Sequence, residues 1–154
     1  MVNNKIKLCL VCSSGGHFSE LYFLQDFWSA YDRFWVTFER EDTAIVLKKE
    51  AVYFAHSPTN RHPKNFLRNF VLAWKILRRE RPSCVVSTGA GVAVPFIYVG
   101  KILRMKTIFI ETLSRVEKMS LSGRLVYFPV DVFLAQWPEL AGKHKKIAFR
   151  GQVI

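Results

Sequence analysis

Short apolar runs alternate along the chain with longer segments in which apolar side chains recur every three or four residues. A short apolar run between polar residues predicts a buried strand, whereas the three-to-four-residue period predicts a helix. The expected strands are Ile6–Val11, Phe34–Phe38, Val52–Phe54, Cys84–Ser87, Thr107–Ile110 and Val132–Ala135, with a possible last strand at Ile147–Phe149.

Amphipathic segments separate these strands. The segment Glu20–Trp28, for example, places Leu21, Leu24, Phe27 and Trp28 on one side of a helix. Strands that are apolar on both faces and separated by helices indicate a parallel sheet covered on both faces. We therefore expect an α/β fold with a Rossmann-like parallel sheet. No repeat or linker divides the 154 residues, so residues 1–154 are predicted to form one domain.

Three chemically unusual loops follow expected strands. They are SSGGH (13–17), STGAG (87–91) and ETLSR (111–115). Ligands of open parallel sheets bind outside the carboxyl ends of the strands. The three loops are therefore predicted to share one crevice.

The first loop has the composition of an anion site. Ser13 and Ser14 offer hydroxyls, Gly15 and Gly16 allow close backbone approach, and His17 opens the following helix, whose N-terminus favours negative charge. This composition indicates a phosphate or diphosphate site. A plain tight turn, with His17 as a polar first-turn residue, remains open. A dinucleotide site is a rival because Glu39 lies at a suitable distance downstream, although the spacing G-x-G-x-x-G is missing.

The other two loops extend this pattern. Ser87, Thr88 and Gly89 form a second small-residue loop, which favours one enlarged anion crevice over two unrelated turns. Glu111 ends an apolar strand, where a carboxylate is costly to bury unless it is paired or used. Arg115 is either its ion partner or a phosphate ligand.

The positive charge changes the expected partners. The chain has 23 Lys and Arg against 12 Asp and Glu, a formal net charge of +11, which favours polyanionic partners. Between Arg61 and Arg81 there are seven basic residues and one acid. A basic helical face beside aromatic residues is typical of interfacial helices, so an anionic membrane surface is expected here rather than an ordinary solvated face. The predicted membrane-binding residues are Lys64, Arg68, Trp74, Lys75, Arg78 and Arg79.

Other classes of protein are disfavoured. Nucleic acid competes for the positive charge, but the chain carries no recognised nucleic-acid-binding motif. No window has the ~20 apolar residues of a membrane-spanning helix, and no secretory signal is present. Cys9, Cys12 and Cys84 indicate packed, reduced thiols of a cytoplasmic protein, and no metal site is expected.

Together the segments SSGGHFSEL, STGAG and IETLSRVE resemble the Alg14 family and its bacterial capsule and exopolysaccharide counterparts. They resemble more distantly the N-terminal half of MurG-type glycosyltransferases. The resemblance covers Lys5 to Gly151. It implies the N-terminal, acceptor-side half of a GT-B glycosyltransferase. A separate Alg13-like subunit would hold the UDP-sugar, so this chain is expected to need no cofactor of its own.

The resemblance also implies roles for the three loops. The chain would be the subunit of an inverting glycosyltransferase that binds a polyprenyl-diphosphate-linked acceptor at the cytoplasmic face of a membrane. His17 would be the general base, with Glu111 as second candidate. Ser14, Gly15, Gly16 and Ser87–Gly89 would contact the diphosphate.

Membrane attachment and partner binding follow from the same resemblance. Eukaryotic members add an N-terminal membrane anchor, whereas here few residues precede the first expected strand, so attachment would depend on the basic surface and a prokaryotic version is expected. The C-terminal segment AFRGQVI is expected to contact the partner, with a simple edge strand as the alternative. A non-catalytic membrane-recruitment subunit and a stand-alone nucleotide-binding protein remain alternatives.

Overall fold

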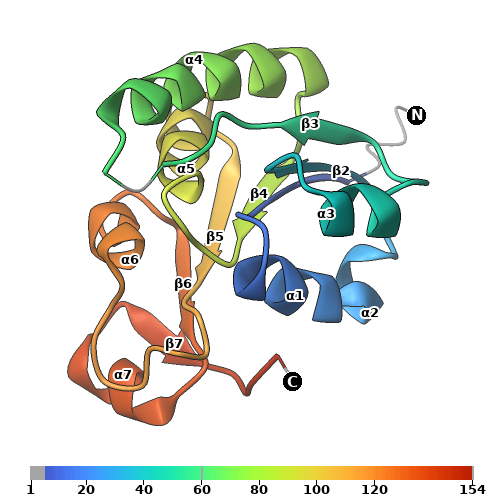
Figure 1. The fold of residues 1–154 in the computed structure, drawn as a ribbon. Coiled ribbons are helices and arrows are strands. Elements are labelled where there is room, and N and C mark those ends of the chain that lie inside the picture. Colours follow the sequence, from blue (N-terminus) through green and yellow to red (C-terminus); the bar gives the residue numbers. More distant parts are fainter. Residues whose placement is uncertain (1–5, 60, 154) are drawn as a thin grey trace, which may run out of the picture.

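The computed structural model describes residues 6–59 and 61–153 and contains one sheet of seven parallel strands (Figure 1). All seven expected strands are confirmed, with shifts of one or two residues at some ends. The strands are β1 (Lys7–Val11), β2 (Asp32–Thr37), β3 (Val52–Phe54), β4 (Cys84–Ser87), β5 (Lys106–Ile110), β6 (Val132–Ala135) and β7 (Ile147–Phe149).

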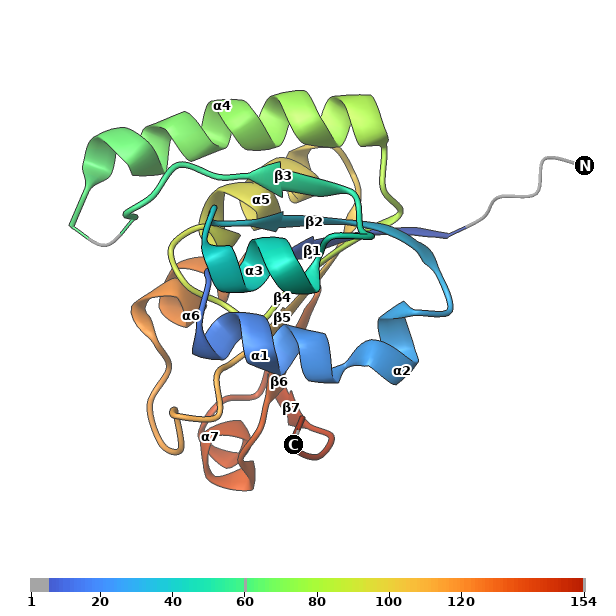
Figure 2. The same ribbon diagram turned by 45° about the vertical axis from the view of Figure 1, so that its right-hand side comes forward.

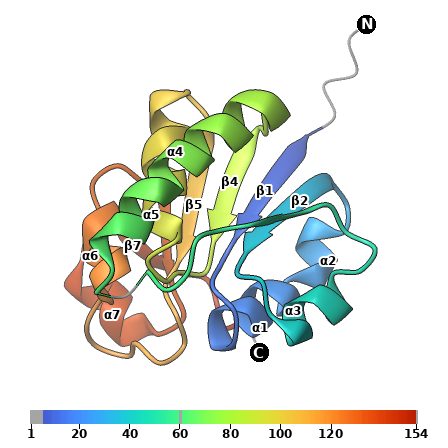
Figure 3. The same cartoon turned by 45° about the horizontal axis from the view of Figure 1, so that its top comes forward.

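Helices cover both faces of the sheet, as the apolar pattern predicted. Figure 3 shows α4, α5 and α6 on one face, with α1, α2 and α3 on the other, and Figure 2 shows α4 running along the sheet. The helices are α1 (Gly16–Phe23), α2 (Gln25–Trp28), α3 (Glu41–Val46), α4 (Pro63–Glu80), α5 (Ala93–Ile102), α6 (Leu121–Val126) and α7 (Pro138–Lys143). The Rossmann-like α/β fold is therefore confirmed.

The strand order β3-β2-β1-β4-β5-β6-β7 reverses direction between β1 and β4. Val11 at the end of β1 pairs with Val36 of β2 and Ser87 of β4, so these strands end level with one another. Chain segments that leave neighbouring strands at such a reversal diverge and leave room for a ligand. The loops after β1 and β4 flank that point.

Side chains at alternate positions of a strand point to opposite faces of the sheet and pack in different cores. Cys9 and Val11 pack with residues of α4 and α5, whereas Leu8 and Leu10 pack with Trp28 and residues of α1. These side chains are almost completely buried, which explains why the strands are apolar at nearly every position.

The expected helix Glu20–Trp28 is interrupted. α1 ends at Phe23, Leu24 adopts a non-helical conformation, and α2 begins at Gln25. Leu21 and Trp28 are buried as expected, but Phe27 is 41% exposed because the turn at Leu24 rotates the second helix. The prediction that Phe27 shares the buried side was therefore wrong.

Helix α4 buries two asparagines that the hydrophobic pattern did not single out. Asn69 accepts a hydrogen bond from His56 N at 2.9 Å and donates one to His56 O at 3.0 Å. Asn65 donates to Ser57 O at 2.9 Å and to Pro58 O at 3.2 Å. Buried amides need such partners. The two asparagines therefore hold the loop between β3 and α4 against α4.

Candidate functional site

The loops after β1, β4 and β5 lie at one edge of the sheet, as their positions in the sequence predicted (Figure 3). β1 is hydrogen-bonded to β4, and β4 to β5, so the three carboxyl ends are neighbours. The loop between β3 and α4 reaches the same place, since Thr59 and Arg61 line a cavity together with His17.

His17 lies in the first turn of α1 and is locked to the second loop. Its Nδ1 is 2.9 Å from Thr88 O, and Thr88 Oγ1 donates to His17 O at 2.6 Å. A carbonyl oxygen only accepts hydrogen bonds, so Nδ1 carries the hydrogen in the neutral ring and Nε2 carries the lone pair. His17 is therefore held in the tautomer that leaves Nε2 able to accept a proton.

Gly89 allows the loop after β4 to approach the ring of His17 closely. A Cβ atom at this position would lie 3.0 Å from His17 Cε1 and 3.1 Å from His17 Nδ1, and the φ angle of +122° disfavours any side chain. Gly89 N donates to Ser87 Oγ at 3.1 Å. Ser87, Thr88 and Gly89 are buried and shape the loop, while Ala90 beside them lines the cavity.

The first loop presents backbone donors at the N-terminus of α1. Gly15 precedes the helix with φ +79°, and no side chain caps the helix. The first N–H groups of a helix have no partner within it, and the helix dipole favours an anion there. Gly15 and Gly16 are exposed, and Ser13 and Ser14 line a cavity of about 460 Å³ together with His17. Glu39 lines the same cavity.

A second cavity of about 320 Å³ is also lined by His17, and it shares Thr59 and Ala90 with the first. Arg61 and Arg115 supply guanidinium groups, several Ser and Thr residues supply hydroxyls, and Phe66 and Leu125 belong to an apolar wall. Guanidinium groups pair with phosphate oxygens through parallel hydrogen bonds. A cavity with this lining suits a phosphorylated ligand that also carries an apolar part.

Glu111 is placed differently from His17. Its side chain is 1% exposed and does not line either cavity beside His17. Oε1 accepts a hydrogen bond from Thr112 N at 3.1 Å, and Oε2 accepts from Ser120 N at 2.9 Å and interacts with Ser120 Oγ at 3.1 Å. Burial raises the pKa of this carboxyl, and the bonds from Ser120 partly offset that effect.

Arg115 and Glu111 form no ion pair in the described part of the chain. Arg115 is exposed, its N donates to Thr112 O at 3.0 Å, and the residue lines the cavity of Arg61. Arg115 therefore lies on the wall of this cavity, and its role as a phosphate ligand stays a prediction.

Two polar residues that the sequence did not single out join the loops. Glu20 Oε1 accepts hydrogen bonds from Thr112 Oγ1 at 2.7 Å and Leu113 N at 3.1 Å. Gln136, which is 2% exposed, donates to Glu20 Oε2 at 3.3 Å and accepts from Val153 N at 3.0 Å. A polar residue that directly follows a buried strand, as Gln136 follows β6, is the only sequence signal that points to it.

The basic residues of α4 lie on its exposed side. Lys64, Arg68, Trp74, Lys75, Arg78 and Arg79 are all exposed, as predicted. Leu67 and Val71, which lie between them on the helix, are 64% and 57% exposed. This side of α4 therefore combines positive charge with exposed apolar groups.

The three cysteines are buried, and their thiols have raised pKa values. Burial raises the thiol pKa of Cys12 to about 12 and that of Cys84 to about 11, and raises the pKa of Cys9 as well. These thiols stay protonated and unreactive. Among residues 6–59 and 61–153, no three His, Cys, Asp or Glu side chains are grouped as metal ligands, and no helix could cross a membrane.

Known protein families include one whose model matches most of this chain. The model, described as "Oligosaccharide biosynthesis protein Alg14 like", matches residues 54–153, which is more than half of the chain. The chain belongs to the Alg14 family. The matched region of this Alg14-family chain contains the loops at Ser87–Gly91 and Glu111–Arg115, which carried the resemblance together with the first loop.

Relatives in this family are named "UDP-N-acetylglucosamine transferase subunit ALG14". The protein of Yarrowia lipolytica is 32% identical over 92 residues, covering 56% of this chain and 43% of the relative. The human protein is 28% identical over 94 residues, covering 57% and 44%. The mouse protein is 26% identical over 181 residues, covering 97% and 83%. The chain thus matches less than half of the length of the first two relatives.

Solved structures share the fold at low sequence identity. MurG of Acinetobacter baumannii superimposes with a TM-score of 0.79 and 13% identity, covering 97% of this chain and 46% of that one. The UDP-GlcNAc 2-epimerase of Methanocaldococcus jannaschii gives a TM-score of 0.71 and 15% identity, covering 96% and 46%. This Alg14-family chain therefore has the fold of one Rossmann-like half of a GT-B architecture.

Proposed function

We propose that this Alg14-family chain is the acceptor-binding, membrane-associating subunit of a two-component, inverting glycosyltransferase. It acts on a polyprenyl-diphosphate-linked sugar and uses a UDP-sugar that an Alg13-like partner holds. The names of its relatives, each a UDP-N-acetylglucosamine transferase subunit, support a transfer of this kind. A fold that corresponds to about half of MurG supports the need for a second half.

The observation that carries the proposal is the ring of His17, which is held by Thr88 and lines both cavities. In the proposed step, the acceptor hydroxyl attacks the anomeric carbon of the donor sugar, and the hydroxyl proton passes to His17 Nε2. The bond between that carbon and the diphosphate oxygen of the UDP-sugar breaks, and its electron pair leaves with UDP. One in-line attack inverts the anomeric centre, so one well-placed base suffices.

The acceptor diphosphate would lie beside His17. Arg61 and Arg115 would neutralise its charge, and the N–H groups of Gly16 and His17 at the N-terminus of α1 would donate to its oxygens. The apolar wall at Phe66 and Leu125 would take the first part of the polyprenyl chain. Ser13 and Ser14 would contact the sugar side of the ligand.

Glu111 is assigned a positioning role in this proposal. Its carboxyl fixes Thr112 and Ser120, which are the two ends of the loop that carries Arg115. The carboxyl is buried and does not face the cavities, so proton transfer from an acceptor would have no direct route to it.

Binding to the cytoplasmic face of the membrane is assigned to α4. Leu67 and Val71 would enter the interfacial layer, with Arg68 and Lys75 above anionic headgroups. The N-terminus of α4 lies beside the cavity of about 320 Å³, since Arg61 and Phe66 line that cavity together with His17. A lipid-linked acceptor would therefore reach the cavity without leaving the membrane.

The test reconstitutes the chain with its donor-binding partner and measures sugar transfer to lipid-linked acceptors. His17→Ala is expected to lower kcat about 100-fold, the usual scale for a lost general base. Glu111→Gln is expected to lower it less. In the same preparations, Arg68→Glu/Lys75→Glu is expected to abolish binding to vesicles of phosphatidylcholine and phosphatidylglycerol. Lys48→Glu/Lys49→Glu, exposed on the α3 side, is the control for charge.

Two results would contradict the assignment. Full turnover by His17→Ala, together with lost vesicle binding by Arg68→Glu/Lys75→Glu, would make the chain a non-catalytic recruitment subunit. Saturable binding of NAD by the isolated chain would favour a stand-alone nucleotide-binding protein instead, with Glu39 in the cavity beside Ser14 as its ribose ligand.

A further inference from the structure

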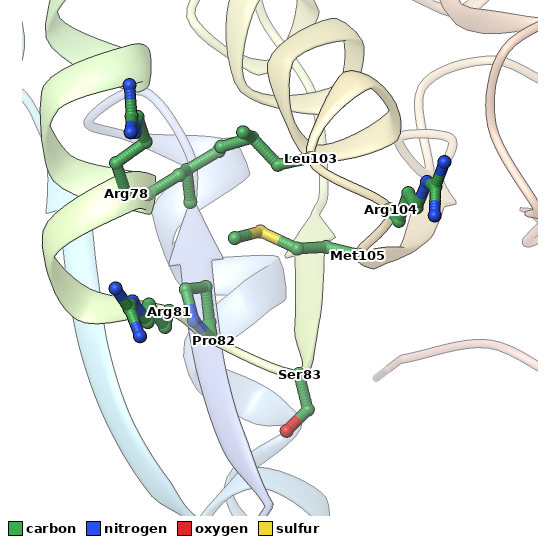
Figure 4. A pocket seen from close by; sticks show the side chains of 8 residues that line it. Arg78, Arg81, Pro82, Ser83, Leu103, Arg104 and Met105 are labelled. Atoms are coloured by element: carbon green, nitrogen blue, oxygen red, sulfur yellow. The ribbon is translucent and has the colours of Figure 1, made fainter.

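A separate pocket lies at the opposite, amino edge of the sheet. It has a volume of about 390 Å³ and lies between the C-terminal end of α4 and that of α5 (Figure 4). Arg78 and Arg81 lie on one side and Arg104 on the other. Apolar groups from Pro82, Leu103 and Met105 lie between them, Ser83 lies at the lower edge, and Leu77 also lines the pocket.

The three arginines of this pocket have no acidic partner in the described part of the chain. The acids on the neighbouring elements are already engaged, since Glu80 pairs with Lys7 at 2.6 Å and Asp131 pairs with Lys101 at 2.5 Å. No carboxylate lines the pocket. The pocket therefore holds uncompensated positive charge.

The backbone gives a second, independent observation. Arg81 and Arg104 have φ angles of 46° and 62°, in the left-handed region that favours glycine at helix ends. Only two other non-glycine residues in the described chain have positive φ angles, Arg61 and Ala90, and both line the cavity beside His17. The attraction between a cation and a helix C-terminus explains why an arginine lies near the end of a helix. It does not explain why Arg81 and Arg104 occupy the two positions with positive φ angles, where glycine would avoid backbone strain.

The pocket continues the apolar side of α4. Leu67, Val71, Trp74 and Arg78 follow one another at helical spacing along the exposed side, and the guanidinium of Arg78 lies 5.6 Å from the Trp74 ring centre. On α5, Ile102 is 65% exposed just before Leu103 and Arg104. Exposed apolar groups thus lead to the pocket from both helices.

We propose that this pocket binds the phosphate group of an anionic phospholipid. The side chains of Arg81 and Arg104 extend outward on opposite sides of the pocket in Figure 4 and turn inward to contact the phosphate oxygens, while the apolar residues between them contact the first carbons of the lipid. The site extends the membrane association proposed above and rests on it for its supply of lipid. α4 spans about 27 Å, so a lipid held here fixes the end of the helix far from the cavity of His17.

The test uses the full chain and short-chain phosphatidylglycerol below its micelle concentration, with affinity measured by calorimetry. Arg81→Gly/Arg104→Gly removes both guanidinium groups at positions where glycine relieves backbone strain, so it is expected to melt no lower than the wild type. Its affinity for the lipid is expected to fall at least tenfold. Lys48→Gln/Lys49→Gln removes the same charge elsewhere and is expected to change affinity less than twofold.

The outcomes separate the possible ligands. Equal loss of affinity in both double variants, or no binding of short-chain phosphatidylglycerol to the wild type, would overturn the proposal. Equal affinity for short-chain phosphatidylcholine would also overturn it, because the pocket would then ignore charge. Equal affinity for inorganic phosphate would assign the site to free phosphate and reject the lipid. The test needs no partner, sugar or vesicle, so its failure is distinct from failure of the proposed transferase activity.

Discussion

At the scale of single residues, Gly89 is the position on which the geometry of His17 depends. Gly89→Ala would place a Cβ 3.0 Å from the ring of His17 in a backbone conformation with φ +122°. We expect a loss of about 1–3 kcal/mol in the free energy of unfolding. Sugar transfer should fall nearly as far as in His17→Ala, because the ring loses its hold on Thr88. Urea unfolding and the reconstituted transfer assay measure the two effects.

Gly142→Ala is the matched control for Gly89→Ala. A Cβ at Gly142 meets no atom within 4 Å, and the residue lies inside α7. Alanine is the better helix former, so this variant is expected to be neutral or to gain up to about 1 kcal/mol. A Gly89→Ala protein as stable and active as this control would show that the close approach of His17 has no consequence.

The sequence predicted that the loops of the candidate site lie at one edge of the sheet, but it did not predict how their side chains are oriented. The two loops around His17 and Gly89 could be predicted because small residues after an apolar strand are a local pattern. The burial of Glu111 under Ser120, and the bonds from Glu20 to the loop after β5, could not. These contacts join residues far apart in the chain, and no local period encodes them.

At the scale of elements, the C-terminus of α4 is tied to the sheet through Glu80. Its carboxylate accepts hydrogen bonds from Lys7 of β1 at 2.6 Å and from Tyr53 of β3 at 2.5 Å. The bond from Lys7, followed by that from Tyr53, lowers the pKa of Glu80 from 4.5 to about 2. A single carboxylate therefore holds α4 against two strands.

Glu80→Gln should weaken this attachment in a pH-dependent way. The folded-state pKa of Glu80 is depressed, so its contribution is present above about pH 4.5 and is lost as the pH falls toward about 2. Near pH 7 we expect the free energy of unfolding of the variant to be lower by about 1–3 kcal/mol. The loss is smaller than the full pKa shift implies, because Lys7 is partly exposed and water screens the pair. The difference from the wild type should shrink below about pH 4.5. Urea unfolding between pH 3 and 7 measures it.

Glu117→Gln provides the comparison for Glu80→Gln. Glu117 also pairs with a lysine, Lys143 at 3.3 Å, but its side chain is 66% exposed. Surface pairs of this kind contribute little to stability, so this variant should match the wild type at every pH. A Glu80→Gln protein with the same flat profile would show that the attachment of α4 depends on packing alone.

The sequence predicted all seven strands because each is a continuous apolar run between helices. It was less accurate within helices. The break at Leu24 has no glycine or proline to mark it, and periodicity alone extended one helix through it. The polar contacts of Asn65 and Asn69 with the loop before α4 were also not predictable, since a helical pattern counts them as surface residues.

At the scale of the whole molecule, the two proposed lipid contacts lie at opposite ends of α4. The cavity of His17 receives Arg61 and Phe66 from one end, and Arg78 from the other end lines the pocket of Arg104. The side of α4 that exposes Leu67, Val71 and Trp74 also carries the basic residues Lys64, Arg68, Lys75 and Arg78. Two contacts at separate points restrict how a protein can rotate on a membrane, whereas charge alone does not.

The segment after β7 is the one that we expect to contact a partner. Val153 is partly buried and packs against the core that contains Leu10 and Ile110, and its N–H donates to Gln136. Gln136 in turn contacts Glu20, which holds the loop after β5. A partner that docks on this segment would therefore be connected through two side chains to the proposed acceptor site.

Val153→Asp should weaken the complex with the donor-binding partner at least tenfold, since a carboxylate would replace an apolar side chain at the contact. Calorimetric titration with the partner gives the affinity. Ile45→Asp is the control, because Ile45 is 74% exposed on α3, away from this segment. Vesicle binding of both variants should equal that of the wild type. Equal affinity of the two variants for the partner would place the partner elsewhere and leave the segment after β7 as a simple edge.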